Sequence, residues 1–112
     1  MNLNKKDIVS INQEIGEQGN LRNERSLEFA LSLGKHKKSW LYELSYLLRC
    51  LLVDHAFEDG NKRTALVLSI LYIEDQSLLW DKERLLKTMH AIAKKNIKSI
   101  EHIGRMLKNV LN

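Results

Sequence analysis

Apolar residues recur at steps of three and four along nearly the whole chain, and this period constrains the fold more than any other feature. Ile8, Ile11 and Ile15 keep the period near the N-terminal end, and Ile103, Leu107 and their neighbours keep it near the other. The strict alternation of apolar and polar residues that is typical of half-buried strands is essentially missing. The sequence therefore predicts an all-α fold, a compact bundle of helices with short connections.

About six helices are expected from this period and from the residues that begin and end helices. Proline is absent, so every helix must end at Gly, Asn, Asp or Ser rather than at Pro. The third and fourth helices are so rich in leucine and isoleucine that both are expected to be buried. The predicted boundaries are Asn4 and Gly19 for the first helix, Asn23 and Gly34 for the second, Trp40 and about Asp54 for the third, Asn61 and about Glu74 for the fourth, with caps at Ser39, Asp81 and Ser99 for the third, fifth and sixth.

The composition is that of one globular domain, which we expect to span residues 1–112. Hydrophobic residues make up 44% of the chain and charged residues 29%, which excludes a disordered or a collagen-like protein. Cys50 is the only cysteine and can form no internal disulfide, so a reducing compartment is expected. No segment approaches the roughly 20 apolar residues of a membrane span, and the N-terminal end lacks the apolar core of a signal peptide. These features predict a soluble, cytoplasmic protein.

The formal net charge of +4 is unevenly distributed. Residues 81–112 contain eight basic and three acidic residues, a net charge of +5, whereas residues 1–80 contain ten and eleven, a net charge of −1. A basic surface of this kind is typical of proteins that bind nucleic acid or an acidic protein, but a solvated helical face has the same composition. The charge alone leaves these alternatives open.

Polar, ionisable and flexible residues are concentrated between the third and fourth helices, in residues 55–64 with the sequence HAFEDGNKRT. Gly60 and Asn61 open a helix there, and the free backbone N–H groups of its first turn can bind a phosphate. Lys62 and Arg63 add two positive charges, which the helix dipole disfavours at this end unless an anion is bound. The segment therefore predicts a phosphate site. The alternative interpretation of these residues is an ordinary turn with surface charge.

Three other side chains of the segment have a predicted role beside a phosphate. Asp59 is a suitable ligand for Mg²⁺, which prefers one or two carboxylates together with phosphate oxygens. His55 is suited to act as a general base on a hydroxyl group, although a histidine that only ends a helix is the alternative. Phe57 is expected to anchor the loop in the core. A Walker-type phosphate loop is excluded, because the glycine that it requires before Gly60 is missing.

Residues 55–63 match the signature H-x-F-x-[D/E]-G-N-x-R of the Fic/Doc family at all six specified positions. The continuation KRTAL, residues 62–66, resembles the death-on-curing (Doc) branch of that family, as does the segment LRNE, residues 21–24. The resemblance implies an all-α, Fic/Doc-like fold in which His55 is the general base and Asp59 the Mg²⁺ ligand. It also implies that Gly60, Asn61, Lys62 and Arg63 form the phosphate cradle and that Phe57 is structural.

The family modifies hydroxyl side chains of proteins with a nucleotide and Mg²⁺, so the cofactors implied are ATP and Mg²⁺. The Doc branch transfers the terminal phosphate of ATP to elongation factor Tu, as the toxin of a toxin–antitoxin pair. Most Fic members transfer AMP instead, and they carry a small residue where this chain has Lys62 and an arginine where it has Leu66. The resemblance therefore implies phosphoryl transfer to a Ser or Thr hydroxyl. AMP transfer and a catalytically silent basic binding module are the alternatives.

The partners that this resemblance implies are the acceptor protein and a separate antitoxin. The antitoxin is expected because the family's inhibitory motif [S/T]-x-x-x-E-[G/N] is not matched: its nearest fits, Ser10 to Glu14 and Ser39 to Glu43, are followed by Ile15 and Leu44. A membrane and nucleic acid are not expected partners. The short segment from Lys35 to Ser39 is the candidate for the flap that docks the acceptor in this family.

Two other histidines, both tryptophans and the cysteine are expected to have structural or surface positions and no functional role. His90 and His102 lie on amphipathic stretches without metal-ligand spacing, and we expect surface histidines. Trp40 and Trp80 are expected at the edge of the core, and Cys50 is expected to be inert packing.

Overall fold

The computed structural model of the chain describes residues 1–36 and 39–112, with only the backbone of residues 34–36. This described part contains six α-helices and no strand, which confirms the predicted all-α fold. Lys37 and Lys38 of the predicted docking flap lie outside the described residues. The helices are α1 (Lys5–Glu14), α2 (Glu24–His36), α3 (Trp40–Leu52), α4 (Asn61–Asp75), α5 (Lys82–Lys95) and α6 (Ile100–Lys108).

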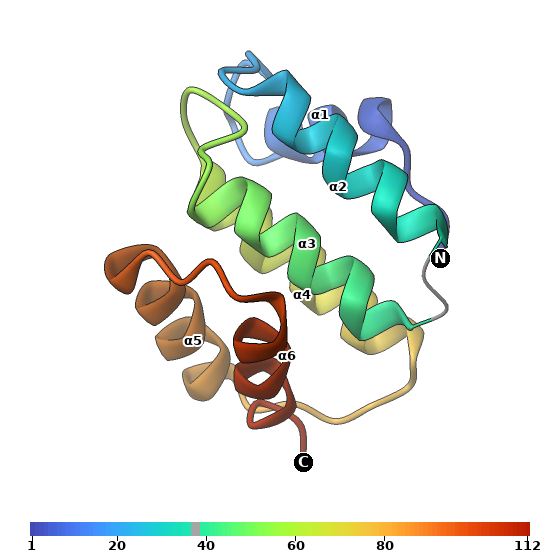
Figure 1. Cartoon of the computed structure of the whole chain (residues 1–112), viewed down its shortest axis with the longest axis vertical. Coiled ribbons are helices and arrows are strands. Elements are labelled where there is room, and N and C mark those ends of the chain that lie inside the picture. Colours follow the sequence, from blue (N-terminus) through green and yellow to red (C-terminus); the bar gives the residue numbers. More distant parts are fainter. Residues whose placement is uncertain (37–38) are drawn as a thin grey trace.

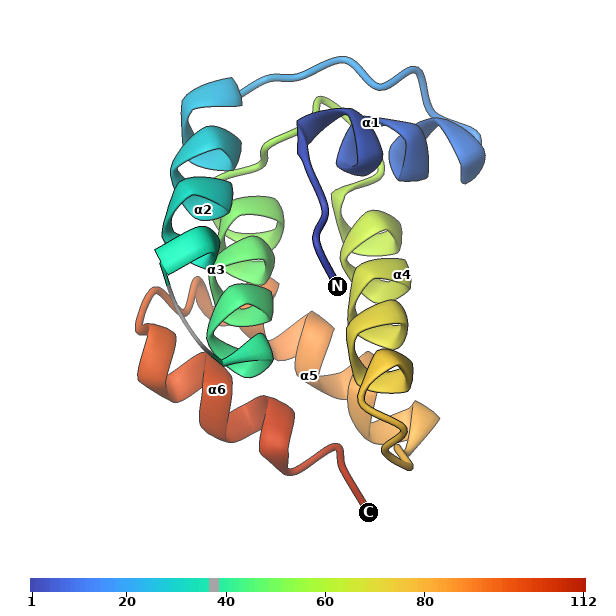
Figure 2. The same ribbon diagram turned by 90° about the vertical axis from the view of Figure 1, so that its right-hand side faces the viewer.

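Helix α3 is the centre of the molecule and packs against α2, α4, α5 and α6. Figures 1 and 2 show α3 and α4 side by side as an antiparallel pair, joined by the loop that carries the predicted site. Helix α1 crosses the N-terminal end of α4, and α5 covers the pair from another side. The chain forms a globule with a radius of gyration of 12.6 Å. Among the described helices, none is both long and apolar enough to cross a membrane.

The N-terminal caps explain why three helices begin where the sequence predicts. The Asn4 side chain accepts a hydrogen bond from the Asp7 backbone, and the Asp7 carboxylate accepts one from the Asn4 backbone, both at 2.9 Å. Asp81 accepts the backbone N–H of Arg84 at 2.9 Å, and Ser99 accepts that of His102 at 3.2 Å. These bonds satisfy N–H groups that have no partner within a helix, and they confirm the predicted starts of α1, α5 and α6.

Two predicted helix ends are wrong. Helix α1 ends at Glu14 and not at Gly19, because Gly16 already adopts a left-handed conformation with a φ of 101°. Helix α2 continues through Gly34 to His36. The early end of α1 has a structural consequence, since it leaves residues 15–20 as a loop that lies against the start of α4.

The core is built around α3, as its leucine content predicts. Helix α4 was expected to be buried to the same extent, but Leu68 and Ile73 are buried while Leu71 is 40% exposed. The difference arises because α1 crosses only one end of α4, so that the outer face of the helix is uncovered. Trp40 and Trp80 are partly buried against the core, as predicted. The buried residues of α3 are Leu44, Ser45, Leu47, Leu48, Cys50, Leu51 and Leu52.

Candidate active site

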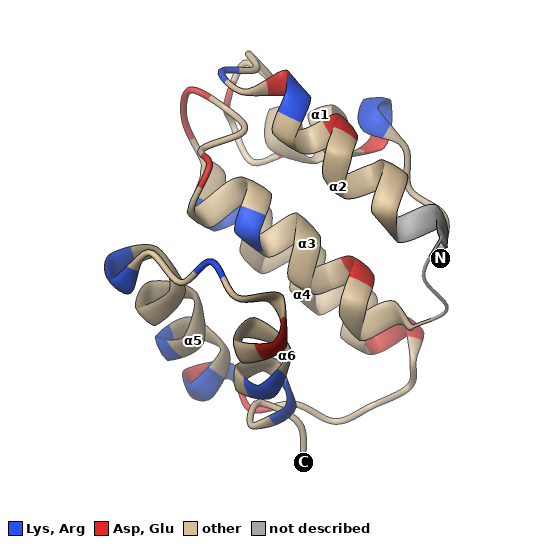
Figure 3. Ribbon diagram, in the orientation of Figure 1, with Lys and Arg blue, Asp and Glu red and all other residues tan. Residues whose placement is uncertain are grey.

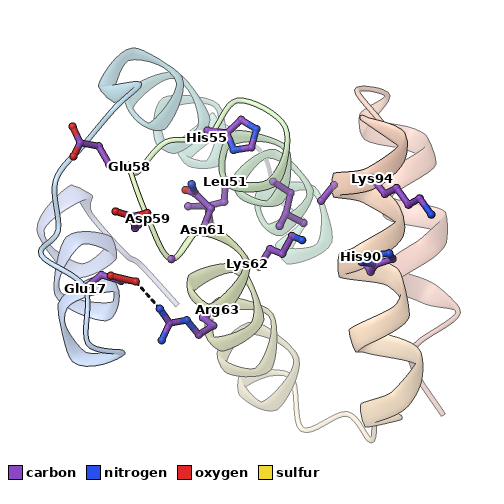
Figure 4. Close-up of a pocket in the computed structure, with 13 residues that line it drawn as sticks. Glu17, Leu51, His55, Glu58, Asp59, Asn61, Lys62, Arg63, His90 and Lys94 are labelled. Carbon is purple, nitrogen blue, oxygen red and sulfur yellow. Dashed lines mark hydrogen bonds and ion pairs between the residues drawn. The ribbon is translucent and has the colours of Figure 1, made fainter.

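A cleft of about 820 Å³ lies where the α3–α4 loop, the first turn of α4 and the C-terminal half of α5 meet. Figure 4 shows the loop and the start of α4 on one side of this cleft and α5 on the other. The predicted site residues that line it are His55, Asp59, Gly60, Asn61, Lys62 and Arg63. Seven of the nine residues from 55 to 63 therefore line one wall of a single cavity, and the two that do not are Ala56 and Phe57. We call the loop and the start of α4, residues 55–63, the loop wall, and α5 the helix wall.

The loop wall is fixed from below by Phe57 and Asn61. Phe57 is fully buried in the core. The Asn61 side chain accepts a hydrogen bond from the Phe57 N–H at 2.9 Å and donates one to the Phe57 carbonyl at 2.8 Å. The amide of Asn61 is therefore used inside the loop, and the group that Asn61 offers to a ligand is its backbone N–H.

The backbone around His55 is held in an unusual conformation. The φ of His55 is 53°, in the left-handed region that few residues other than glycine adopt. Next to it, the Ala56 carbonyl accepts hydrogen bonds from the backbone N–H groups of Arg22 at 2.7 Å and Asn23 at 3.1 Å, and the Ala56 N–H donates to the Cys50 carbonyl at 3.1 Å. Strain of this kind persists only where surrounding contacts enforce it, and it is concentrated at functional sites. The exposed imidazole of His55 is thereby presented to the cleft.

Gly60 is required where the loop turns into α4. Its φ is 80°, and a Cβ atom at this position would lie 2.6 Å from Cγ of Glu17 and 3.1 Å from Nδ2 of Asn12. A larger residue would therefore meet both backbone strain and a steric clash. This close approach joins the loop wall to the segment that follows α1.

Asn12 fastens the same junction from the side of α1. Its side chain is fully buried, donates to the Asp59 carbonyl at 3.0 Å and to the Thr64 hydroxyl at 3.2 Å, and accepts the Gly19 N–H at 2.8 Å. The buried position and the role of Asn12 were not predicted from the sequence. The signal was present, because Asn12 follows Ile8 by four residues and so lies on the apolar face of α1.

The first turn of α4 is open to an anion. Gly60 supplies no side-chain cap, and the backbone N–H groups of Asn61, Lys62 and Arg63 donate to no acceptor within the described part of the chain. These groups and the helix dipole together favour a bound phosphate or carboxylate.

The two cations of this turn differ in their surroundings. Arg63 forms an ion pair with Glu17 at 2.5 Å, drawn in Figure 4, and also donates to the Ile15 carbonyl at 3.1 Å. Lys62 has no hydrogen-bond or ion-pair partner among residues 1–36 and 39–112, and its side chain points from α4 toward α5. The role of Glu17 was also not predicted from the sequence. Its role depends on a contact with a residue 46 positions away, which leaves no local pattern.

Asp59 is positioned to bind a metal ion only together with a ligand. The carboxylates of Asp59 and Glu58 are exposed at the cleft and have no partner among the described residues. In that part of the chain, no three His, Cys, Asp or Glu side chains lie close enough together to hold a metal ion. Mg²⁺ typically takes one or two carboxylates and completes its shell with phosphate oxygens and water. Asp59 fits that manner of binding, in which one protein carboxylate acts together with ligand oxygens and water.

The helix wall contributes residues to which the sequence analysis gave no role. His90 is exposed, as expected of a surface histidine, but it lines the cleft together with Lys94. His102 is exposed and lies outside the cleft. Cys50 is no candidate nucleophile, because the side chain is 1% exposed and burial raises the pKa of its thiol to about 12.

In comparisons with models of protein families and with curated proteins, the chain matched none.

Proposed function

We propose that the chain is a Doc-type protein phosphotransferase of the Fic/Doc family, which uses Mg²⁺ and ATP to phosphorylate a Ser or Thr hydroxyl of another protein. The observation that carries the proposal is the composition of the loop wall. A histidine, a carboxylate without a partner and an open helix N-terminus with Lys62 beside it all face one cleft. A general base, a metal ligand and a phosphate cradle are the three parts that phosphoryl transfer to a hydroxyl requires.

In the proposed reaction, His55 accepts the proton of the acceptor hydroxyl, whose oxygen forms a bond to the γ-phosphorus of ATP. The bond from the γ-phosphorus to the β,γ-bridging oxygen breaks, so that the acceptor gains one phosphate and ADP leaves. The first turn of α4 and Lys62 hold the transferred phosphate and stabilise its charge. Mg²⁺ bound through Asp59 would neutralise further phosphate charge.

The fixed backbone of the loop wall supports this assignment. Rates of group transfer depend on the position of the reacting groups, and an error of about 1 Å can cost roughly 10²-fold. The hydrogen bonds of Ala56 and Phe57 hold the stretch of loop between His55 and Asp59. The cradle and the proposed base are therefore placed before a ligand binds.

The expected acceptor is elongation factor Tu, and the expected biological role is that of a toxin controlled by a separate antitoxin. Both follow from the resemblance of residues 55–66 to the Doc branch. A six-helix fold with the signature between its two central helices supports that resemblance.

The decisive experiment incubates the purified protein with Mg²⁺, elongation factor Tu and ATP labelled at either the α or the γ phosphorus. We expect label from the γ position only, with a mass gain of one phosphate on a Ser or Thr. His55→Ala should lower the rate by about 10²–10⁴-fold, and Asp59→Ala should lower the rate and raise the Mg²⁺ concentration that activity requires. His102→Ala is the matched control, because it removes an exposed histidine outside the cleft.

Label from the α position would show AMP transfer and would overturn the assignment of the phosphate that moves. Full activity of His55→Ala would overturn the role of the base. If elongation factor Tu is not labelled but another protein of a host lysate is, the proposed acceptor is wrong and the proposed type of reaction still stands.

A further inference from the structure

The helix wall carries basic side chains that nothing in the described structure neutralises. His90 and Lys94 project from successive turns of α5 and line the cleft opposite the loop wall. Within the described residues neither forms a hydrogen bond or an ion pair, and the same holds for Lys62, which points toward them across the cleft. Elsewhere on α5, Lys87 pairs with Glu83 at 3.4 Å and Arg84 donates to the Asn109 carbonyl at 3.3 Å.

Apart from the ion pair between Arg63 and Glu17, the positive and negative charges of the cleft are separated and form no ion pairs with one another within the described residues. Glu58 and Asp59 lie on the side nearer α1, whereas His90 and Lys94 lie on the side of α5. The exposed carboxylates form no ion pair with the exposed cations, although both line the same cavity. Figure 3 shows that Lys and Arg are frequent on α5, so the positive potential of this helix reinforces its side of the cleft. Such a cavity favours a ligand that brings its own negative charges to the helix wall.

We propose that His90 and Lys94, with Lys62, form a second anion subsite that holds the far end of a phosphate chain whose near end lies on the first turn of α4. The ligand class is a linear polyphosphate, and this inference rests on the proposed function in taking the natural ligand to be a nucleoside triphosphate. The γ-phosphate lies beside His55 on the loop wall, and the phosphate next to the nucleoside lies on the helix wall. Lys62 reaches from α4 toward the helix wall, so that it contacts the γ-phosphate and also the phosphates beyond it.

The long side chain of Lys94 makes this subsite adjustable. In Figure 4 its ammonium group points across α5 and away from the loop wall, so the side chain must rotate about its bonds to reach an anion in the cleft. His90 is shorter, and its imidazole lies on the cleft side of α5. The subsite therefore orders on binding, whereas the cradle on α4 is already formed.

The test compares two inorganic probes, orthophosphate and linear triphosphate, in calorimetric titrations at fixed Mg²⁺ and salt. Orthophosphate is a single phosphate and can occupy only one subsite at a time, whereas the proposal requires linear triphosphate to contact both walls. The double variant His90→Ala/Lys94→Ala should weaken triphosphate binding about tenfold, because two charge-assisted contacts are lost, and should change orthophosphate binding less than about twofold. His90 and Lys94 are exposed, as are Lys95 and His102, which are substituted in the control below, so both double variants are expected to fold.

The matched control is the double variant Lys95→Ala/His102→Ala, which removes the same two residue types from exposed positions outside the cleft. It should leave the binding of both probes unchanged. Equal losses in the two double variants would show a general charge effect and overturn the subsite. Triphosphate binding that survives intact in His90→Ala/Lys94→Ala would overturn it as well.

The proposed function is judged separately, because these titrations involve no transfer reaction. A tenfold loss in a protein that transfers no phosphate supports the subsite and counts against the phosphotransferase. Phosphate transfer without that loss supports the phosphotransferase and overturns the subsite.

Discussion

The two walls of the cleft are built by different physical means. In the loop wall, backbone and side-chain hydrogen bonds hold Phe57, Ala56 and Asp59, and a buried ring lies beneath them. In the helix wall, His90 and Lys94 are free of such bonds within the described structure, and α5 is held through buried apolar residues such as Leu85 and Met89. The first wall fixes positions and the second supplies charge.

Because the two walls are held differently, substitutions in the loop wall should lower stability, whereas substitutions in the helix wall should weaken binding alone. A substitution beneath the loop wall removes buried contacts and leaves polar groups unsatisfied. A substitution on the exposed face of the helix wall removes only charge or a partly solvated surface, and it should leave the free energy of unfolding nearly unchanged.

Phe57→Ala should show the largest difference in stability between the two walls. Loss of a fully buried phenylalanine leaves a cavity beneath the loop and should lower the free energy of unfolding by about 4 kcal/mol, measured by urea denaturation. Leu86→Ala removes a side chain of α5 that is 45% exposed, and it should cost less than about 1 kcal/mol. Similar costs for the two variants would show that the walls are equally dependent on packing.

Asn12→Ala should have the next largest effect. It removes three hydrogen bonds and leaves the Asp59 carbonyl, the Thr64 hydroxyl and the Gly19 N–H without this partner. We expect a loss of about 2–3 kcal/mol in the free energy of unfolding. Asn20→Ala is the control, because Asn20 is exposed and bonds only to the Gln18 side chain through its own side chain, at 3.3 Å. A cost for Asn12→Ala no greater than that of the control would contradict the buried junction.

Glu17→Gln should have the smallest effect on stability. It tests whether the ion pair with Glu17 keeps Arg63 from binding an anion, whereas Lys62 has no such partner in the described residues. The Arg63 side chain is 59% exposed, so loss of the ion pair should cost less than about 1 kcal/mol. Orthophosphate affinity should rise about threefold, because Arg63 is no longer neutralised and a negative charge leaves the cleft. Glu14→Gln, which removes an exposed carboxylate outside the cleft, should leave that affinity unchanged. Equal affinities in the two variants would exclude competition by Glu17.

Features encoded by neighbouring residues were predicted correctly from the sequence. The number of helices follows from apolar periodicity, and the starts of α1, α5 and α6 follow from cap residues that bond three positions ahead. The gathering of His55, Asp59 and the start of α4 in one cleft follows from their closeness in sequence. The end of α1 was missed because Gly16 and Gly19 are both plausible stops: both have a positive φ, 101° and 74°, and the helix ends before the first of them.

Features that depend on distant residues could not be predicted in this way. Nothing near Glu17 indicates that it pairs with Arg63, and nothing near Asn12 indicates that it binds the Asp59 carbonyl. The helix wall was missed for the same reason, since the position of His90 beside the cleft depends on how α5 packs against α3 and α4.

The contacts of Asn12 also bear on the order in which the chain can fold. During synthesis Asn12 leaves the ribosome 52 residues before Thr64, its partner on α4. Helix α1 can therefore form early, and Gly19 can then donate to the Asn12 side chain, but the NH₂ group of Asn12 has no partner until Asp59 and Thr64 have emerged and α4 has docked. Closing so long a loop costs entropy that the new contacts must offset. The loop wall consequently acquires its shape late in folding, and incomplete chains contain residues 55–63 before the cleft has formed.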